Sequence, residues 1–401
     1  MTSNLKLETL CATAGVARDP AYGSVAPPLY LSANYAWNSP EDKPQYDYAR
    51  SGNPTRCQLE TALCDLEGAQ AGVVVSSGMA ALNLVLNLVA PGETVFAPHD
   101  CYGGTHRLLT SRAKIGHFNL LYVNQSDSTE LAKAFANEKP KLILIETPSN
   151  PLLRITDIEA CVKLAKANDA ITVADNTFLS PLFQRPLDLG CDIVVHSTTK
   201  FLNGHSDVVG GAVLARDKAL GEELAWWANC TGVTGAPFDS FMTLRGIRTL
   251  SPRLERQQET ASGVVAALQV DDRIARVYYP GIETHPGHLT AKRQQTGFGS
   301  MFSVELVAGL SAIEFIKALD LFTIAESLGG FESLVCVPAA MTHAAMTAEA
   351  KNVAGIGETL VRFSIGLEHE RDLRADISNA LDHLVLSGAN TAQQKQQSGI
   401  R

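Results

Sequence analysis

A lysine, Lys200, stands just after a short apolar run that ends at Val195, where a strand of a buried sheet is expected to end. Ser197 and Thr199 alternate along the expected strand, so both hydroxyl groups face the same way. A partly desolvated lysine amine can bond an aldehyde as a Schiff base, and hydroxyl groups beside it can hold a phosphate. For Lys200 alone, a solvated strand end is the ordinary alternative.

An aspartate, Asp175, ends an earlier apolar run and precedes Lys200 by 25 residues, about one strand–helix unit. This spacing lets both side chains emerge at the same edge of adjacent strands, where ligands collect in parallel sheets. A carboxylate there can keep a pyridine nitrogen protonated, so that the ring serves as an electron sink. A turn residue or helix cap is the alternative for Asp175 by itself. The two residues together indicate chemistry.

Two further positions could bind anionic groups. Gly78 and Met79 open a helical pattern directly after an apolar run, and the N–H groups of a helix start can bind phosphate. A simple helix cap is the alternative there. Arg362 alternates with apolar residues in a predicted strand, so it faces away from the core and can hold a carboxylate in a bidentate fork. A surface arginine paired with a glutamate is the alternative reading of Arg362.

The elements that must position these residues fall into three parts of different composition. Residues 1–57 are rich in turns, prolines and aromatics, which favours an arm that contacts a neighbouring subunit. Residues 58–252 alternate short β-branched runs with helical patterns, which predicts a large α/β domain whose mostly parallel sheet is covered on both faces. Residues 253–401 predict a smaller α+β domain with a long final helix.

Composition excludes several classes of function. The formal net charge of −9 argues against a broad nucleic-acid interface, which needs a basic face. The 8 cysteines are scattered without a Cys-x-x-Cys pair, and His285 and His288 have no third ligand nearby, so we expect no metal site. The start of the chain lacks a secretory pattern, and its most apolar stretch is short and interrupted by Asn83 and Asn87. We therefore expect a cytoplasmic protein without a membrane span.

Several motifs, occurring together and in order, resemble the Cys/Met-metabolism family of pyridoxal-phosphate enzymes over nearly the whole chain. They are "YARSGNPTR" at 48–56, "SSGMAA" at 76–81, "VADNTFLSP" at 173–181, "HSTTKFLNGHSD" at 196–207 and "ESLGGFESL" at 326–334. The resemblance implies pyridoxal 5'-phosphate (PLP) as cofactor and the fold type I architecture, with a sheet of the seven-stranded type. It also implies a homotetramer of paired dimers, with active sites shared across the dimer interface, and small amino-acid substrates.

Matched by position, the family pattern assigns a role to each candidate residue. Lys200 would be the Schiff-base lysine and a catalytic base, with Tyr102 stacked on the cofactor ring and assisting it. The other cofactor-binding residues would be Asp175, Gly78, Met79, Ser197 and Thr199, joined by Tyr48 and Arg50 from the neighbouring subunit. The substrate-binding residues would be Arg362, Asn150, Ser327, Glu326 and Arg107.

Within the family, the segments "PSNPLLRITDI" and "LAWWANCTGVTGAPFDSF" look most like the branch that makes L-cystathionine and succinate from O-succinyl-L-homoserine and L-cysteine. Gly104 stands where methionine γ-lyases carry a reactive cysteine, and Leu328 stands where β-lyases carry a tryptophan. Ser51 stands where some members of the first branch carry an arginine that would serve a succinyl carboxylate, and Arg107 could replace it. The γ-cleavage of cystathionine and the use of O-acetyl-homoserine are the alternatives.

Two readings outside this chemistry make different demands on the sequence. A non-catalytic PLP carrier would have lost Lys200, Asp175 or Arg362, and all three are present. A nucleotide-dependent enzyme of the doubly wound type would need a G-x-G-x-x-G turn, and the chain has none.

Overall fold

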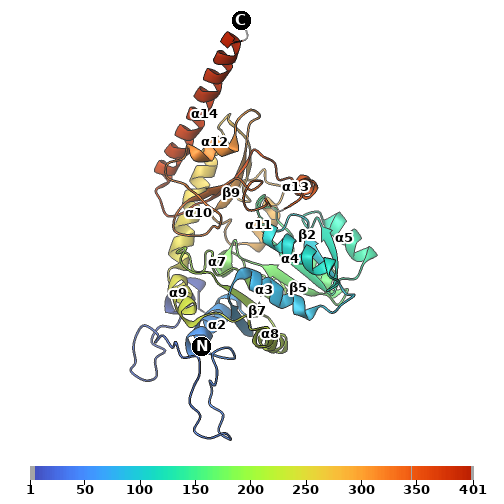
Figure 1. Ribbon diagram of the computed structural model, residues 1–401, viewed down its shortest axis with the longest axis vertical. Coiled ribbons are helices and arrows are strands. Elements are labelled where there is room, and N and C mark those ends of the chain that lie inside the picture. Colours follow the sequence, from blue (N-terminus) through green and yellow to red (C-terminus); the bar gives the residue numbers. More distant parts are fainter. Residues whose placement is uncertain (1–4, 345, 399–401) are drawn as a thin grey trace.

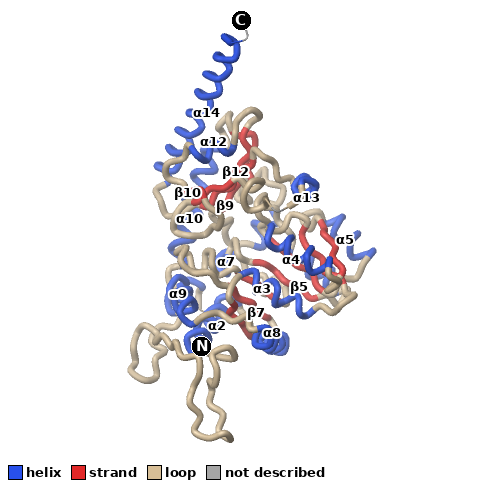
Figure 2. The backbone as a smooth tube through the Cα atoms, viewed as in Figure 1, coloured by secondary structure: helices blue, strands red, loops and turns tan. Residues whose placement is uncertain are grey.

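The N-terminal part of the chain has little regular structure. The computed structural model describes residues 5–344 and 346–398, with side chains described up to residue 386. A short helix, α1 (Leu7–Thr13), precedes residues 14–53, which form turns and loops that extend away from the rest of the chain (Figure 2). An isolated bridge pairs Asn34 with Tyr48 inside this arm. Its irregular structure agrees with its turn-rich sequence, whereas its contact with another subunit stays a prediction.

A seven-stranded sheet follows the arm (Figure 1). Its strands are β1 (Ala71–Val75), β2 (Thr94–Pro98), β3 (Asn119–Val123), β4 (Leu142–Glu146), β5 (Ile171–Asp175), β6 (Ile193–His196) and β7 (Gly211–Ala215). They lie in the order β1-β7-β6-β5-β4-β2-β3. Strand β7 is antiparallel to both of its neighbours, and the remaining pairs are parallel. The predicted mostly parallel sheet is confirmed.

Helices cover both faces of this sheet. They are α2 (Pro54–Glu67), α3 (Gly78–Val85) with the 3-10 turn η1 (Leu86–Leu88), α4 (Gly103–Lys114), α5 (Ser128–Asn137), α6 (Ile158–Lys166), α7 (Ser180–Phe183), α8 (Lys218–Thr231) and α9 (Pro237–Ile247). Val73 and Val75 of β1 share one apolar cluster with Leu82 of α3, whereas Val74 shares another with Leu63 of α2. Because both faces are filled, the edge at the strand ends is where a ligand site can form.

A second, smaller sheet has five strands in the order β10-β11-β12-β9-β8. They are β8 (Ile274–Tyr278), β9 (Met301–Leu306), β10 (Thr323–Ile324), β11 (Leu334–Cys336) and β12 (Leu360–Ser364). The helices of this part are α10 (Leu250–Leu268), α11 (His288–Gln294), α12 (Ala312–Lys317), α13 (Ala348–Ala354) and α14 (Glu370–Ser398). Figure 1 shows the end of α14 projecting away from both sheets. The predicted α+β character is confirmed, and the boundaries at residues 57 and 252 stay predictions.

Two strand predictions were wrong in detail. Ser197 and Thr199 do not alternate along a strand, because β6 ends at His196, the last residue that pairs with β7. The chain then turns, and the Lys200 N–H donates a hydrogen bond to the Ser197 carbonyl at 3.2 Å. Strand β8 begins at Ile274, earlier than the predicted strand "VYYPG" at 277–281, because its pairing with β9 starts there.

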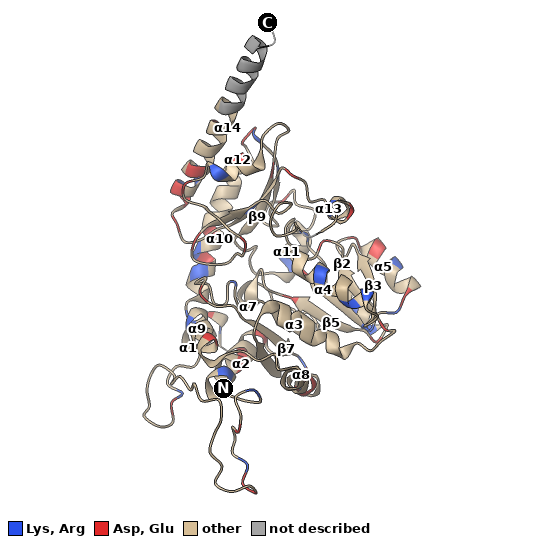
Figure 3. Ribbon diagram, in the orientation of Figure 1, with Lys and Arg blue, Asp and Glu red and all other residues tan. Residues whose placement is uncertain are grey.

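The described residues carry mixed charges on their surface helices and include no membrane-spanning helix. Figure 3 shows Lys and Arg interspersed with Asp and Glu on α5, α10 and α14. No helix in the described ranges is both long and apolar enough to cross a bilayer. The same residues contain no cluster of three or more His, Cys, Asp or Glu side chains that could hold a metal ion.

Candidate active site

A cavity of about 390 Å³ opens at the carboxyl ends of β4, β5 and β6, where the two sheets face each other. Most of the residues predicted from the sequence line it, namely Gly78, Met79, Tyr102, Asn150, Asp175, Ser197, Thr199, Lys200, Glu326, Ser327 and Arg362. They come from distant parts of the chain. The fold therefore brings together amine, carboxylate, hydroxyl and guanidinium groups around one space.

One end of the cavity is built to hold an anion. Helix α3 begins here, with the Ser77 hydroxyl accepting a hydrogen bond from the Ala80 N–H at 3.1 Å, so the helix start faces the cavity. A Cβ placed on Gly78 would lie only 2.6 Å from Cβ of Ser197, so a residue without a side chain is required at this close approach. The turn after β6 adds the hydroxyls of Ser197 and Thr199. These donors suit a phosphate group.

Asp175 lies at the end of β5 with one of its oxygens accepting a hydrogen bond from the Thr177 N–H at 3.0 Å. Burial raises the pKa of this carboxyl group above its ordinary value, and its hydrogen bonds with Thr177 act in the opposite direction. A cationic partner, such as a protonated ring nitrogen, would offset the cost of desolvating the carboxylate.

Lys200 lies between the two sheets. Its Nζ donates a hydrogen bond to the Ser327 hydroxyl at 2.6 Å. Burial and, to a lesser extent, the nearby charge of Arg362 lower the pKa of Lys200 to about 8, against the opposing effect of Glu326. The structure thus makes the neutral, nucleophilic form of this amine accessible near neutral pH.

Arg362 is held in place by two acceptors. Its neighbours Val361 and Phe363 are buried in the apolar core of the second sheet, while Arg362 turns to the cavity. One terminal N–H donates to Asn150 Oδ1 at 2.9 Å and the other to the Ser327 carbonyl at 2.9 Å. Its buried Nε has no hydrogen-bond partner within the described structure. A carboxylate could satisfy this group.

Ser327 links these two side chains, which the sequence alone could not show. Its backbone adopts a left-handed conformation (φ 84°), which is uncommon for a residue with a side chain. In this conformation its hydroxyl meets Lys200 and its carbonyl meets Arg362. Strained backbone of this kind is found at functional sites.

Glu146 is a cavity residue that sequence reasoning missed. It ends β4, its register partner on β5 is Asp175, and only 7% of its surface is exposed. Its carboxyl group accepts hydrogen bonds from the backbone N–H of Tyr102 at 2.9 Å and of Asn150 at 3.0 Å. The signal that singled out Asp175, a carboxylate ending a parallel strand, was also present at Glu146.

Three predicted residues do not line the cavity. Tyr48 and Arg50 lie on the arm, where the Arg50 guanidinium sits over the Tyr48 ring and donates to Asn229 Oδ1 at 3.0 Å. Arg107 is exposed on α4 and outside the cavity lining. The roles of these residues stay predictions.

Comparison with known proteins agrees with this geometry. The family described as "Cys/Met metabolism PLP-dependent enzyme" matches residues 8–382. The chain belongs to this family. It is 49% identical to cystathionine γ-synthase of Escherichia coli (strain K12), over 93% of this chain and 97% of that protein. It is also 43% identical to cystathionine β-lyase of Coxiella burnetii, over 94% of this chain and 97% of that protein.

The fold agrees as well. The crystal structure of cystathionine γ-synthase from Xanthomonas oryzae pv. oryzae in complex with cystathionine has a TM-score of 0.93 and 54% sequence identity, over 95% of this chain and 99% of that one. The protein is therefore a PLP-dependent enzyme of the fold type I class, as the family resemblance predicted.

The residues around the cavity fit PLP chemically. A helix start with two hydroxyls suits its phosphate, a buried carboxylate suits its ring nitrogen, and an amine with a lowered pKa suits its aldehyde. The set of functional groups thus matches the cofactor that the family uses.

Proposed function

We propose that this enzyme catalyses a γ-replacement in which O-succinyl-L-homoserine and L-cysteine give L-cystathionine and succinate. The observation that carries the proposal is the link from Lys200 through Ser327 to Arg362, which sets a basic amine beside a carboxylate-binding group. The 49% and 54% identities to two cystathionine γ-synthases favour this reaction over the others of the family. The product serves methionine biosynthesis by trans-sulfuration, and we place the enzyme in the cytoplasm.

The proposed chemistry assigns each proton to a residue. PLP, when bound, supplies the electron sink that lets protons leave Cα and Cβ of the amino acid. Arg362 and Asn150 bind and orient the α-carboxylate. The neutral amine of Lys200 would take the proton from Cα and pass it on toward the cofactor, so that the amine is neutral again when it takes a proton from Cβ, with Tyr102 assisting. Succinate leaves from Cγ, the thiolate of cysteine bonds to the same carbon, and the same groups return the protons.

The other cavity residues keep the roles that the family pattern assigns. Asp175 would keep the ring nitrogen protonated and Lys200 would anchor the cofactor, while Gly78, Met79, Ser197 and Thr199 would hold the phosphate. We propose that Tyr48 and Arg50 of a neighbouring subunit complete this phosphate site within a homotetramer of paired dimers.

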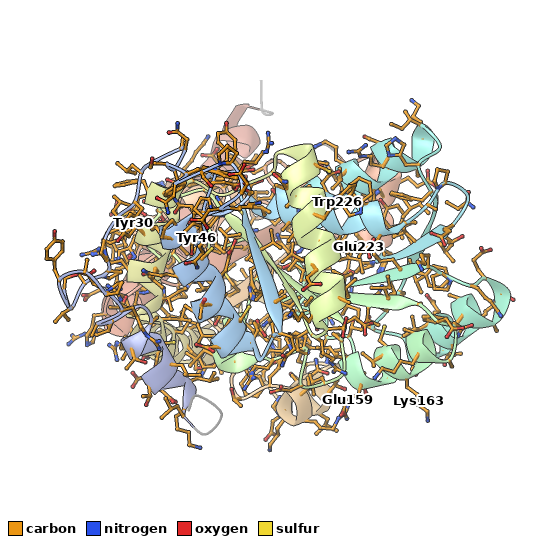
Figure 4. The ribbon with its side chains drawn as sticks, turned by 90° about the horizontal axis from the view of Figure 1, so that it is seen from below. Tyr30, Tyr46, Glu159, Lys163, Glu223 and Trp226 are labelled. Carbon is orange, nitrogen blue, oxygen red and sulfur yellow. The ribbon has the colours of Figure 1, made fainter. Side chains whose placement is uncertain are left out.

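Exposed apolar side chains support this assembly. Tyr48 is 50% exposed and Trp226 of α8 is 59% exposed. Figure 4, which views the molecule from below, shows Tyr30 and Tyr46 of the arm to the left of Trp226 on α8. Large exposed apolar side chains such as Tyr48 and Trp226 are typical of an interface with another subunit.

Cleavage of cystathionine is the second candidate, because a β-lyase is also 43% identical. Leu328, where β-lyases carry a tryptophan, is a buried residue of the cavity lining. At Gly104, where methionine γ-lyases carry a cysteine, an added Cβ would lie 2.5 Å from the Tyr102 ring. Both positions favour γ-replacement over these two cleavage reactions, whereas γ-cleavage of cystathionine itself has to be separated by experiment.

The identity of the acyl group on the homoserine substrate, succinyl or acetyl, is the most specific part of the proposal. Ser51, whose hydroxyl donates to Asp47 Oδ1 at 2.8 Å, has no positive charge with which to bind a succinyl carboxylate. Arg107, which we propose for that task, is exposed on α4. We propose that Glu326, in the cavity lining, contacts the amino-acid substrates. O-acetyl-homoserine would need no cation at the distal end.

One product assay tests the whole proposal. The holoenzyme is given O-succinyl- or O-acetyl-L-homoserine, each with and without L-cysteine, and in a separate reaction L-cystathionine alone. Formation of cystathionine and succinate from the succinyl ester and cysteine is the expected result. Rapid release of 2-oxobutanoate from cystathionine alone would contradict it and favour the γ-lyase reaction, and faster use of the acetyl ester would change the substrate.

A further inference from the structure

Two acidic side chains lie next to each other at the inner edge of the cavity. Glu146 on β4 and Asp175 on β5 are register partners, and both line the cavity. Asp175 has a clear task opposite the cofactor ring. Glu146 has none in the proposed chemistry. Burial, followed by the nearby negative charge of Asp175, raises the pKa of Glu146 well above its ordinary value. Burying a carboxyl group in this way costs free energy, so we expect the position of Glu146 to serve a purpose in the site.

The hydrogen bonds of Glu146 supply that reason. Oε1 accepts from the Asn150 N–H at 3.0 Å and from the Tyr102 N–H at 3.2 Å, and Oε2 accepts from the same Tyr102 N–H at 2.9 Å. One oxygen atom thus contacts the backbone of two loops that are far apart in the sequence. Without it, two backbone N–H groups beside the cavity would lose their acceptor, which is unfavourable in a buried site.

Each of those loops carries a residue of the site. Tyr102 is the N-cap of α4 and has no side-chain cap of its own, so Glu146 satisfies the start of that helix from a neighbouring strand. Asn150 accepts the hydrogen bond of Arg362 at 2.9 Å. A continuous chain of contacts therefore runs from Tyr102 through Glu146 and Asn150 to Arg362.

We propose that Glu146 is a positioning residue whose carboxyl group sets the ring-stacking Tyr102 and the carboxylate-binding Asn150–Arg362 pair relative to each other. The proposal rests on the roles given above to Tyr102 and Arg362. In this proposal Glu146 contacts neither a reacting atom nor the substrate. What matters is the place of the acceptor oxygen, and the negative charge of the side chain is not required.

Three substitutions separate geometry from charge. Glu146→Gln carries no charge and keeps one carbonyl oxygen, which in the place of Oε1 can accept from both N–H groups, while its NH2 group, in the place of Oε2, has to turn away from the Tyr102 N–H. Glu146→Asp keeps the charge but is one carbon shorter and cannot reach both loops. Glu146→Ala removes the acceptor. Asp192→Ala is the matched control for Glu146→Ala, because Asp192 also accepts hydrogen bonds, from Thr172, but lies outside the cavity lining.

Two readouts report on the two ends of the contact chain. The visible circular dichroism of bound PLP reports the environment of its ring, without any reaction taking place. The KM for O-succinyl-L-homoserine, measured apart from kcat, reports carboxylate binding. We expect Glu146→Ala and Glu146→Asp to reduce the dichroism and to raise KM about tenfold, the effect of leaving a buried donor unpaired, while Glu146→Gln stays near the wild-type values.

Three outcomes would overturn the proposal. In the first, Glu146→Ala behaves like Asp192→Ala in both readouts. In the second, Glu146→Ala changes one readout and leaves the other as in the wild type. In the third, Glu146→Gln loses as much as Glu146→Asp, which would show that one acceptor oxygen in the place of Oε1 is not sufficient. If Glu146→Ala does not fold, the comparison of Gln with Asp still decides. Because the dichroism needs no substrate, failure here is separate from failure of the proposed reaction, which the wild-type assay tests.

Discussion

Arg362 and Asn150 both line the cavity, and a hydrogen bond of 2.9 Å joins the Arg362 guanidinium to Asn150 Oδ1. Arg362 projects from β12 of the small sheet, and Asn150 lies in the loop after β4 of the large one. His343 supports the same loop, with its Nε2 3.1 Å from the Asn150 carbonyl. Burial lowers the pKa of His343 to about 4, so this ring is neutral at neutral pH and its Nε2–H donates. Arg362 and Asn150, the proposed carboxylate-binding pair, are therefore held by contacts from both parts of the chain.

Arg362→Lys should weaken substrate binding without loss of the cofactor. Lysine cannot form the two fixed N–H contacts that Arg362 makes with Asn150 and Ser327, so we expect KM for the amino-acid substrate to rise by roughly 10- to 100-fold. Steady-state kinetics and the PLP content of the purified protein measure the two effects. Arg374→Lys, in the surface ion pair with Glu370, is the control. An unchanged KM would contradict the proposed role of Arg362.

Gly104→Ala should displace the Tyr102 ring. The new Cβ would lie 2.5 Å from Cε1 of that ring and 3.0 Å from Sδ of Met79. The ring is partly exposed and can swing aside, so we expect weaker PLP binding and lower kcat with little change in thermal stability. Gly357→Ala is the matched control, because a Cβ there meets nothing within 4 Å. Equal PLP affinity in the two variants would show that the ring does not need the space at Gly104.

The positions of Asp175, Lys200 and Arg362 could be predicted because regular periodicity determines them. Parallel strands end at a common edge, which brought Asp175 and Lys200 together, and alternation along a strand turned Arg362 toward the cavity. The turn after β6 could not be foreseen, because its start depends on where pairing with β7 stops. Ser327 was assigned only by family resemblance, since its two contacts depend on a left-handed backbone conformation in a loop.

Residues of the arm could be predicted only as a pattern, because the contacts that the family resemblance implies for them would be with another chain. Tyr48 and Arg50 contact each other and Asn229, and no contact places them in the cavity of their own chain. The family resemblance sends them to the active site of a neighbouring subunit. Nothing else in the sequence indicates that Tyr48 and Arg50 act in a neighbouring subunit, so this role has to be tested by experiment.

Mixing two inactive variants tests whether active sites are shared. Lys200→Ala lacks the anchoring amine, and Arg50→Ala lacks the proposed phosphate contact. A hybrid dimer has one site with native Lys200 and native Arg50, so co-expression should restore activity to about a quarter of the wild-type value under random assortment. The activity of the co-expressed mixture measures this effect, and hybrid dimers isolated through two different tags should reach about half of the wild-type value.

The control mixture combines Lys200→Ala with Arg362→Ala. Both residues line the cavity of their own chain, so every site of a hybrid lacks one of them and no activity should return. Recovery in this control, or its absence in the first mixture, would argue against a shared site.

The lowered pKa of Lys200, about 8, predicts how the apoprotein responds to pH. In the unfolded chain this amine holds its proton up to its ordinary value of 10.5, so between about pH 8 and 10.5 the unfolded state binds more protons than the folded one. The contribution of Lys200 to the free energy of unfolding should therefore rise with pH across this window. Below the window, the cost of burying the charged amine should be fully present. Buried thiols also make the free energy of unfolding depend on pH, for example Cys64, whose pKa is raised to about 12 by burial. They do so equally in a Lys200→Met variant, which therefore serves as the reference. Denaturant unfolding of both apoproteins at several pH values isolates Lys200, and parallel curves for the two would refute the assignment.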